Sequence, residues 1–195
     1  MKVNLVVDVQ NGFVSCGPLA IPGAKPIADK IIEYVKSARS KGEAIFATCD
    51  THDPKLYPQS IEGQKLPLHC AEDTEEHKLI EGLVKDENRG VIIPQGNIID
   101  KSTFASCSVA GRIRTAMCEL EEPIDEIKVF GFCTSICVLN CALTLRNHLP
   151  DKRIVIVTDL CGDVDNKTAQ AALLVAKTNL IELVNSDNEH VEPEI

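Results

Sequence analysis

The sequence predicts a three-layer α/β/α fold around a central, mainly parallel sheet of six strands. Short runs rich in Val, Ile and Leu alternate along the chain with longer amphipathic segments, as in proteins whose parallel strands are joined by helices. A length of 195 residues without internal repeat or linker favours one domain over two. We therefore expect residues 1–195 to form a single domain, with an acidic tail that is frayed after about residue 186.

The first half of the chain begins with an aliphatic run over residues 3–9, which predicts a buried strand. Apolar residues at helical spacing over 28–38 predict a helix, and Gly42 ends it because glycine commonly follows a helix. The run over 44–48 predicts a second strand. Residues 53–68 contain three prolines and predict a long irregular loop, which inside a domain is usually functional.

The remaining elements alternate in the same way. In chain order we expect a helix over 75–84, a strand over 91–94, a helix over 109–120, a strand over 127–132, a helix from about 135 to 148, a strand over 153–158, a helix over 169–178 and a strand over 181–184. In sheets of this kind ligands bind beyond the carboxyl ends of the strands, so functional residues are expected there.

Composition excludes several classes of partner. A formal net charge of −9 argues against a nucleic-acid partner and against an anionic membrane surface. No apolar run approaches the length of a membrane span, and the N-terminus lacks the pattern of a signal peptide. The nine cysteines accompany an ample aliphatic core, so we expect reduced thiols and a cytoplasmic protein.

Four residues able to do chemistry lie at or just after the ends of predicted strands: Asp8, Asp50, His52 and Cys137. Taken singly, an acid after a strand is more often a cap, and a cysteine in an apolar helix is more often part of the core. Cys137, however, lies in the first turn of a predicted helix. Free N–H groups there stabilise a thiolate and can receive an oxyanion. A thiol-redox protein is a more distant alternative, because the chain has no C-x-x-C pair.

Three segments resemble motifs of the isochorismatase-like cysteine hydrolases, a family with a Rossmann-like fold. Residues 8–13 resemble the D-x-Q-x-x-F opening, and residues 131–138 resemble the nucleophile segment G-x-x-T-x-x-C-V. Between them, residues 100–104 resemble the segment that carries the family's lysine. The motifs occur in the family's order, and the resemblance spans residues 1–185.

The resemblance implies a catalytic triad of Asp8, Lys101 and Cys137. Asp8 would accept the thiol proton and later pass it to the departing ammonia, and Lys101 would hold Asp8 in place. The alternative for Lys101 is a solvated loop lysine. The backbone N–H groups of Cys133 and Cys137 would form the oxyanion hole, with a cis peptide bond just before Cys133.

A second set resembles the metal ligands of the nicotinamidase/pyrazinamidase branch of this superfamily: Asp50, His52, Glu62 and His69. Glu62 replaces a loop histidine of many members, and Asp53 and Glu72 are competing acids. The resemblance implies one divalent metal ion. Zn²⁺ is favoured, and Fe²⁺ or Mn²⁺ also suit these donors. The alternative is a polar surface loop with incidental histidines.

In that branch the metal holds a pyridine nitrogen while the thiolate attacks the carboxamide. Phe13 and Phe104 match positions that wall the ring, although each could be ordinary core. Leu66 or Leu68 would fill the space of a tryptophan that this chain lacks. The resemblance therefore implies a metal-dependent amidohydrolase in NAD salvage, which converts nicotinamide to nicotinate and ammonia through a Cys137 thioester.

Two alternatives stay open. One is a metal-independent amidase of the same superfamily that acts on another small amide or carbamoyl compound. The other is a catalytically silent binding protein, and the complete triad argues against it. Relatives commonly self-associate, so the resemblance also implies a possible homo-oligomer.

Overall fold

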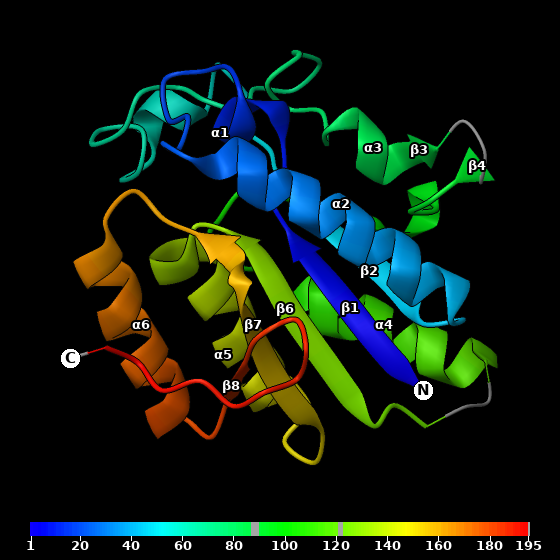
Figure 1. Ribbon diagram of the computed structural model, residues 1–195. Coiled ribbons are helices and arrows are strands. Elements are labelled where there is room, and N and C mark those ends of the chain that lie inside the picture. The colour runs from blue at the N-terminus through cyan, green and yellow to red at the C-terminus, as the bar shows by residue number, and fades with distance from the viewer. Residues whose placement is uncertain (87–89, 121–122, 195) are drawn as a thin grey trace.

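A parallel sheet of six strands forms the centre of the molecule (Figure 1). The computed structural model describes residues 1–86, 90–120 and 123–194. In spatial order the strands are β5 (Ile98–Lys101), β2 (Ala44–Asp50), β1 (Lys2–Val7), β6 (Glu126–Phe132), β7 (Arg153–Gly162) and β8 (Glu182–Val184). Every neighbouring pair is parallel, so all six carboxyl ends lie at one edge. The predicted fold class is confirmed.

Helices cover both faces of the sheet (Figure 1). The long helix α2 (Ala24–Ser40) lies on one face, with the short helices α1 (Asn11–Val14) and α3 (Glu81–Val84). The other face is covered by α4 (Cys107–Leu120), α5 (Leu139–His148) and α6 (Asn166–Thr178). Each face buries its own apolar cluster, which gives the three layers.

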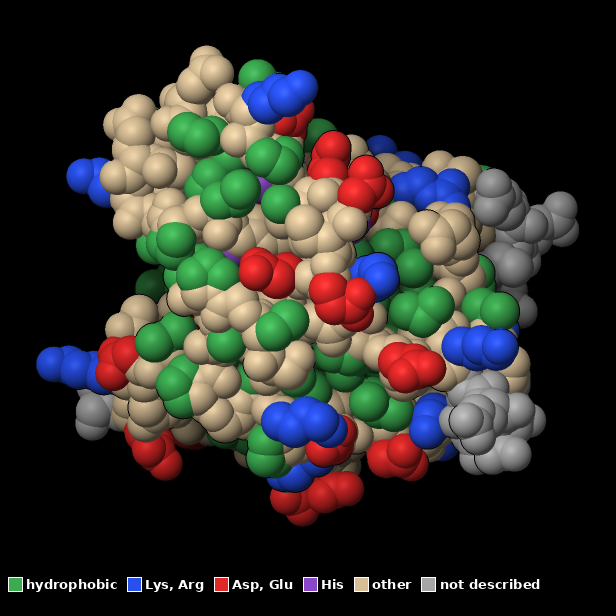
Figure 2. Space-filling view, turned by 90° about the horizontal axis from the view of Figure 1, so that it is seen from above, with side chains coloured by type: hydrophobic (Ala, Val, Ile, Leu, Met, Phe, Trp, Pro, Cys, Tyr) green, Lys and Arg blue, Asp and Glu red, His purple; other side chains and the backbone are tan. Residues whose placement is uncertain are grey.

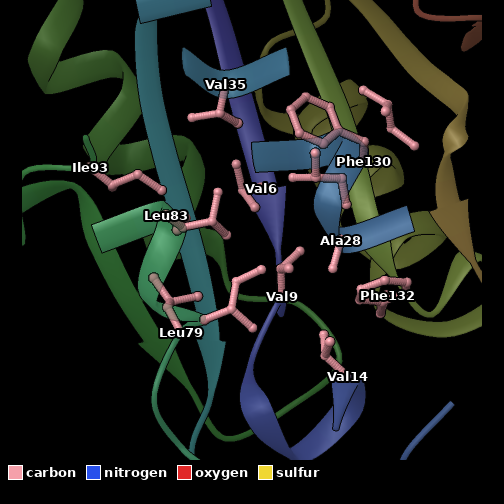
Figure 3. Close-up of a cluster of buried hydrophobic side chains, with 14 of the residues drawn as sticks. Val6, Val9, Val14, Ala28, Val35, Leu79, Leu83, Ile93, Phe130 and Phe132 are labelled. Carbon is pink, nitrogen blue, oxygen red and sulfur yellow. The ribbon is translucent and has the colours of Figure 1, made fainter. Parts of the chain in front are cut away.

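Helix α2 shows how the sequence pattern builds a layer. Apolar residues every three or four positions place Ala28 and Val35 on the side that faces the sheet, where both are fully buried. Figure 3 shows them against Val6 of β1 and Phe130 of β6, which belong to the same cluster. Fully burying a side chain as large as that of Val35 or Phe130 stabilises the fold by roughly 1.5–3 kcal/mol.

One predicted strand is wrong, and another strand takes its place. Of residues 91–94 only Val91 is in a strand. It belongs to β4 (Gly90–Val91), which pairs antiparallel with β3 (Lys85–Asp86) outside the central sheet. The two isoleucines that follow are buried in the cluster beneath α2. The sixth strand is instead β5, which joins the sheet by main-chain pairing with β2 and has only two aliphatic residues before Asp100 and Lys101.

The helix predicted over 75–84 is also shorter than expected, because only α3 is helical. The tail, expected to be frayed, makes hydrogen bonds beside β8: the Val191 N–H donates to the Leu183 carbonyl, and His190 forms a β-bridge with Val184. Within the described ranges, no helix is long and apolar enough to cross a membrane.

Candidate active site

Asp8 lies directly after β1, where the strand turns away from the sheet. Its φ of 51° is in the left-handed region, which Asp tolerates better than most residues. The carboxylate is fully buried. The hydroxyl of Thr48 donates to its Oδ1 atom at 2.7 Å, and the Lys101 ammonium lies 2.7 Å from its Oδ2 atom. Each carboxylate oxygen of Asp8 thus has its own partner.

Lys101 is the last residue of β5, and its ammonium lies at the centre of the site. Its Nζ atom is 3.3 Å from Oδ1 of Asp50 and 3.6 Å from Sγ of Cys137, and the whole side chain is buried. Lys101 is therefore not a solvated loop lysine. Burial alone would lower its pKa, but the facing groups, first of all the Asp8 carboxylate, raise the pKa above its usual range.

Cys137 is carried by a wide turn that links β6 to α5. Residues Thr134–Val138 (η3) form a π-helical turn in which the Cys133 carbonyl accepts the Val138 N–H, and such turns are frequent at functional sites. The peptide bond before Cys133 is cis, as the resemblance implies. Cys137 is buried, with 7% of its surface exposed.

Burial and the neighbouring carboxylates of this site oppose ionisation of the Cys137 thiol. Burial raises the pKa of Cys137 well above its usual range, and the neighbouring Asp8 carboxylate raises it further. Burial also raises the pKa of Asp8, while Lys101 acts in the opposite direction. Because a single ammonium already faces Asp8 and Asp50, a thiolate would add a third negative charge to a buried group.

The four predicted metal ligands also lie close together. The side chains of Asp50, His52, Glu62 and His69 each offer one ligand atom, and these four atoms lie within 4.8 Å of one another. Oδ2 of Asp50 is 3.1 Å from Nε2 of His52 and 3.0 Å from Nε2 of His69. Oε1 of Glu62 lies 3.9 and 3.7 Å from the same two nitrogens. The sequence-based set thus comes together from β2 and the long loop.

The surroundings of this cluster suit a cation. Nδ1 of His69 is 2.9 Å from the Pro67 carbonyl, which leaves Nε2 directed at the cluster, as in metal-binding histidines. Of the competing acids, Asp53 accepts the Lys55 N–H at 2.7 Å, and Glu72 is exposed. Two imidazoles and two carboxylates fit a divalent transition metal.

A cavity of about 240 Å³ opens between Cys137 of the triad and the predicted metal ligands. Predicted residues in its wall are Phe13, Asp50, Glu62, Leu66, His69, Phe104, Cys133 and Cys137. The wall also contains Pro18, Leu19, Ala20, Ile136 and Val164, to which the sequence analysis assigns no role. Leu68 is not part of the wall and is 38% exposed, so Leu66 is the leucine at the site.

Figure 2 views the molecule from above Figure 1, at the end where the sheet's carboxyl edge and the long loop lie. Hydrophobic side chains gather over much of this surface, and histidine shows only in small areas between them. Phe104 at the mouth remains 40% exposed, whereas Phe13 is buried and packs edge-on against His69. A larger hollow of about 770 Å³ lies between α2 and the tail, but none of the predicted site residues lines it.

Comparison with known proteins finds chains of similar sequence and similar fold. The chain shares 28% identity over 190 residues with the nicotinamidase/pyrazinamidase of Mycobacterium tuberculosis, covering 95% of this chain and 100% of that protein. The pyrazinamidase of Pyrococcus horikoshii in complex with zinc has a similar fold, with a TM-score of 0.75, 22% identity and coverage of 94% and 98% of the two chains. PnC1 from L. infantum in complex with nicotinate gives a TM-score of 0.76, 20% identity and coverage of 96% and 93%.

Fold and site together define an α/β protein with a buried thiol, carboxylate and ammonium at the carboxyl edge of a parallel sheet. Residues 2–188 match the isochorismatase domain family. The chain therefore belongs to this family.

Proposed function

We propose that this protein hydrolyses nicotinamide to nicotinate and ammonia, with Cys137 as nucleophile. One observation carries the proposal: the cavity that contains the Cys137 thiol is also walled by Asp50, Glu62 and His69 of the metal-ligand cluster. A small amide whose ring carries a basic nitrogen fits this site, because the thiol can attack the amide while the metal site binds the ring nitrogen. The activity named for the relative from M. tuberculosis supports the same substrate.

The first half of the reaction forms a thioester. Sγ of Cys137 attacks the carboxamide carbon while its proton moves to the Asp8 carboxylate. The carbonyl π electrons move to oxygen, and the backbone N–H groups of Cys133 and Cys137 receive the oxyanion. When the intermediate collapses, the C–N bond breaks and Asp8 returns the proton to the leaving nitrogen, which departs as ammonia.

The second half consumes water. Asp8 removes a proton from the water that attacks the thioester carbon. The new intermediate breaks the C–S bond, and Cys137 recovers the proton from Asp8. Throughout, the ammonium of Lys101 stays beside Asp8 and orients its carboxylate, at the separation of 2.7 Å described above. The net change is one amide and one water to one carboxylic acid and ammonia.

Asp50, His52, Glu62 and His69 would hold a divalent metal ion, with Zn²⁺ favoured. Such an ion supplies a Lewis-acid contact for the ring nitrogen of the substrate. Phe13, Leu66 and Phe104 line the cavity and bind the apolar faces of the ring. The cluster argues for this function over a metal-free amidase, and the buried triad argues for it over a silent binding protein.

The decisive test is ammonia release from a panel of small amides, with and without a chelator. We expect nicotinamide to be turned over and the chelator to abolish turnover. Cys137→Ala should lose all activity and keep the circular dichroism spectrum of the wild type. Cys141→Ala is the matched control, since Cys141 is also a buried thiol, four residues further along the chain. Activity retained by Cys137→Ala would refute the nucleophile.

A further inference from the structure

Asp50 lies at the end of β2, which extends beyond the last residue that pairs with β1. The ladder between β1 and β2 reaches only to the pair Val7 and Thr48, because Asp8 turns the chain away. On that side the main-chain N–H and carbonyl of Asp50 no longer face a strand. Asp50 is buried, with 4% of its surface exposed, so both groups need partners within the protein.

The side-chain amide of Gln10 takes the place of the missing strand. Its Oε1 atom accepts the Asp50 N–H at 2.8 Å, and its Nε2 atom donates to the Asp50 carbonyl at 2.9 Å. Nε2 also donates to the His77 carbonyl at 2.7 Å. Gln10 is fully buried, and both of its N–H donors are used. The Asp50 N–H requires an acceptor, so the orientation of the amide is fixed.

The carboxylate held in this way belongs to both halves of the site. Its Oδ2 atom faces the two histidines at 3.0 and 3.1 Å, and its Oδ1 atom faces Lys101 at 3.3 Å. Since the direction of a side chain follows its main chain, a rotation of the Asp50 backbone would move both oxygens at once. The bonds of Gln10 resist such a rotation.

We infer that Gln10 is a positioning residue that sets the geometry of the metal site through the main chain of Asp50. It touches neither the substrate nor the ligand atoms of the cluster. The inference rests on the proposed function, because it takes Asp50 as a metal ligand. Groups that orient a ligand in this indirect way typically change metal affinity by roughly 10–100-fold when they are replaced.

The test is a titration of metal-free protein with Co²⁺, followed by visible absorption. Gln10→Met keeps the volume and removes all three hydrogen bonds. Gln10→Asn keeps an uncharged amide but shortens the side chain by one methylene, which draws the amide away from the Asp50 main chain, so it serves if the Met variant does not fold. We expect the Co²⁺ affinity of both variants to fall about 10–100-fold, with a changed absorption spectrum, at a temperature where both are folded.

Asn97→Leu is the matched control. The Asn97 amide also donates to the backbone of β2, at the Ile45 carbonyl 2.9 Å away, but far along the strand from Asp50. Its Co²⁺ affinity should stay within about twofold of the wild type.

Unchanged affinity in the Gln10 variants would overturn the inference and leave the proposed function standing. An equal loss of Co²⁺ affinity in Asn97→Leu would mean that the Gln10 variants act through general stability. That result would also overturn the inference. A wild-type protein that binds no Co²⁺ would remove both the inference and the metal part of the proposed function. Because the readout is binding, a failure to hydrolyse nicotinamide does not affect the result.

Discussion

The two oxygens of Asp8 have different partners, and this division explains how a buried carboxylate can act as a base. Burial raises the pKa of Asp8, while Lys101 and the Thr48 hydroxyl both lower it. The ammonium holds one oxygen, and the hydroxyl of Thr48 holds the other at 2.7 Å. The Thr48 hydrogen bond therefore favours the ionised form of the carboxylate and also orients it.

Thr48→Val removes that hydroxyl without a change in shape. Asp8 must be ionised to accept the thiol proton, and losing the hydrogen bond raises its pKa further. The acidic limb of the kcat/KM profile should therefore move to higher pH, and kcat/KM at neutral pH should fall about tenfold, the equivalent of one hydrogen bond to a charged group. Thr158→Val, which removes a hydroxyl bound to the Val184 carbonyl away from the site, should leave the profile unchanged.

At the scale of elements, the approach of β1 to β6 sets where the nucleophile segment begins. Gly131 has a φ of 134°, and a Cβ atom there would lie 2.1 Å from the Val7 carbonyl oxygen. The two strands can pair at this point only if one of them has no side chain. The close contact brings Asp8, which follows β1, toward the turn that follows β6.

Gly131→Ala should consequently lower the free energy of unfolding by more than about 3 kcal/mol, because the clash is with the backbone and adds to the strain at positive φ. Gly42→Ala is the control: its φ is also positive, at 78°, but nothing lies within 4 Å of the new Cβ. It should cost about 1 kcal/mol. Chemical denaturation of both variants measures the difference, and equal losses would contradict the steric argument.

The sequence correctly predicts the elements that are rich in aliphatic residues because they are buried. It fails for elements that are held mainly by main-chain hydrogen bonds. The strands of aliphatic residues are predicted within a few positions. β5 is missed because it ends in Asp100 and Lys101, and an edge strand needs only one neighbour. The Ile92 and Ile93 pair suggests a sheet strand, yet these residues fill the cluster beneath α2. Their hydrophobicity predicts burial correctly but not the partner.

The candidate site is predicted by motif rather than by periodicity. The resemblance points to Lys101 and Glu62, and the structure brings both to the cavity region. Gln10 belongs to the D-x-Q-x-x-F motif, but the resemblance gives it no role. Thr48 is not predicted as a site residue, because a buried threonine in a strand is common without any function. The positions of their hydrogen-bond partners show what each side chain does.

At the scale of the whole molecule, the metal-ligand cluster joins parts of the chain that are otherwise linked by a long loop. Asp50 ends β2 and His52 follows it, whereas Glu62 and His69 belong to the long loop. An ion that binds these four groups in the folded state alone must raise stability by mass action.

Zn²⁺ at about 1,000 times its Kd should therefore stabilise metal-free protein by about 4 kcal/mol. For a chain of this size that corresponds to a rise in Tm of roughly 8–16 °C. Glu62→Gln should show a smaller rise, because it removes one carboxylate ligand. Glu72→Gln changes a competing acid that is exposed, and it should behave as the wild type in differential scanning fluorimetry. An equal effect of the two substitutions would contradict the assignment of Glu62.

The two margins of the sheet bear on how copies of this chain can meet. An open strand edge is a template on which another chain can add a strand and begin to aggregate. Here one margin, β5, has only four residues with Asp100 exposed among them, and at the other the tail from Ser186 onward folds beside β8. Neither margin offers a long, flat, apolar template. Association by sheet extension is thus disfavoured, and any assembly of this protein is expected to use its helices and loops.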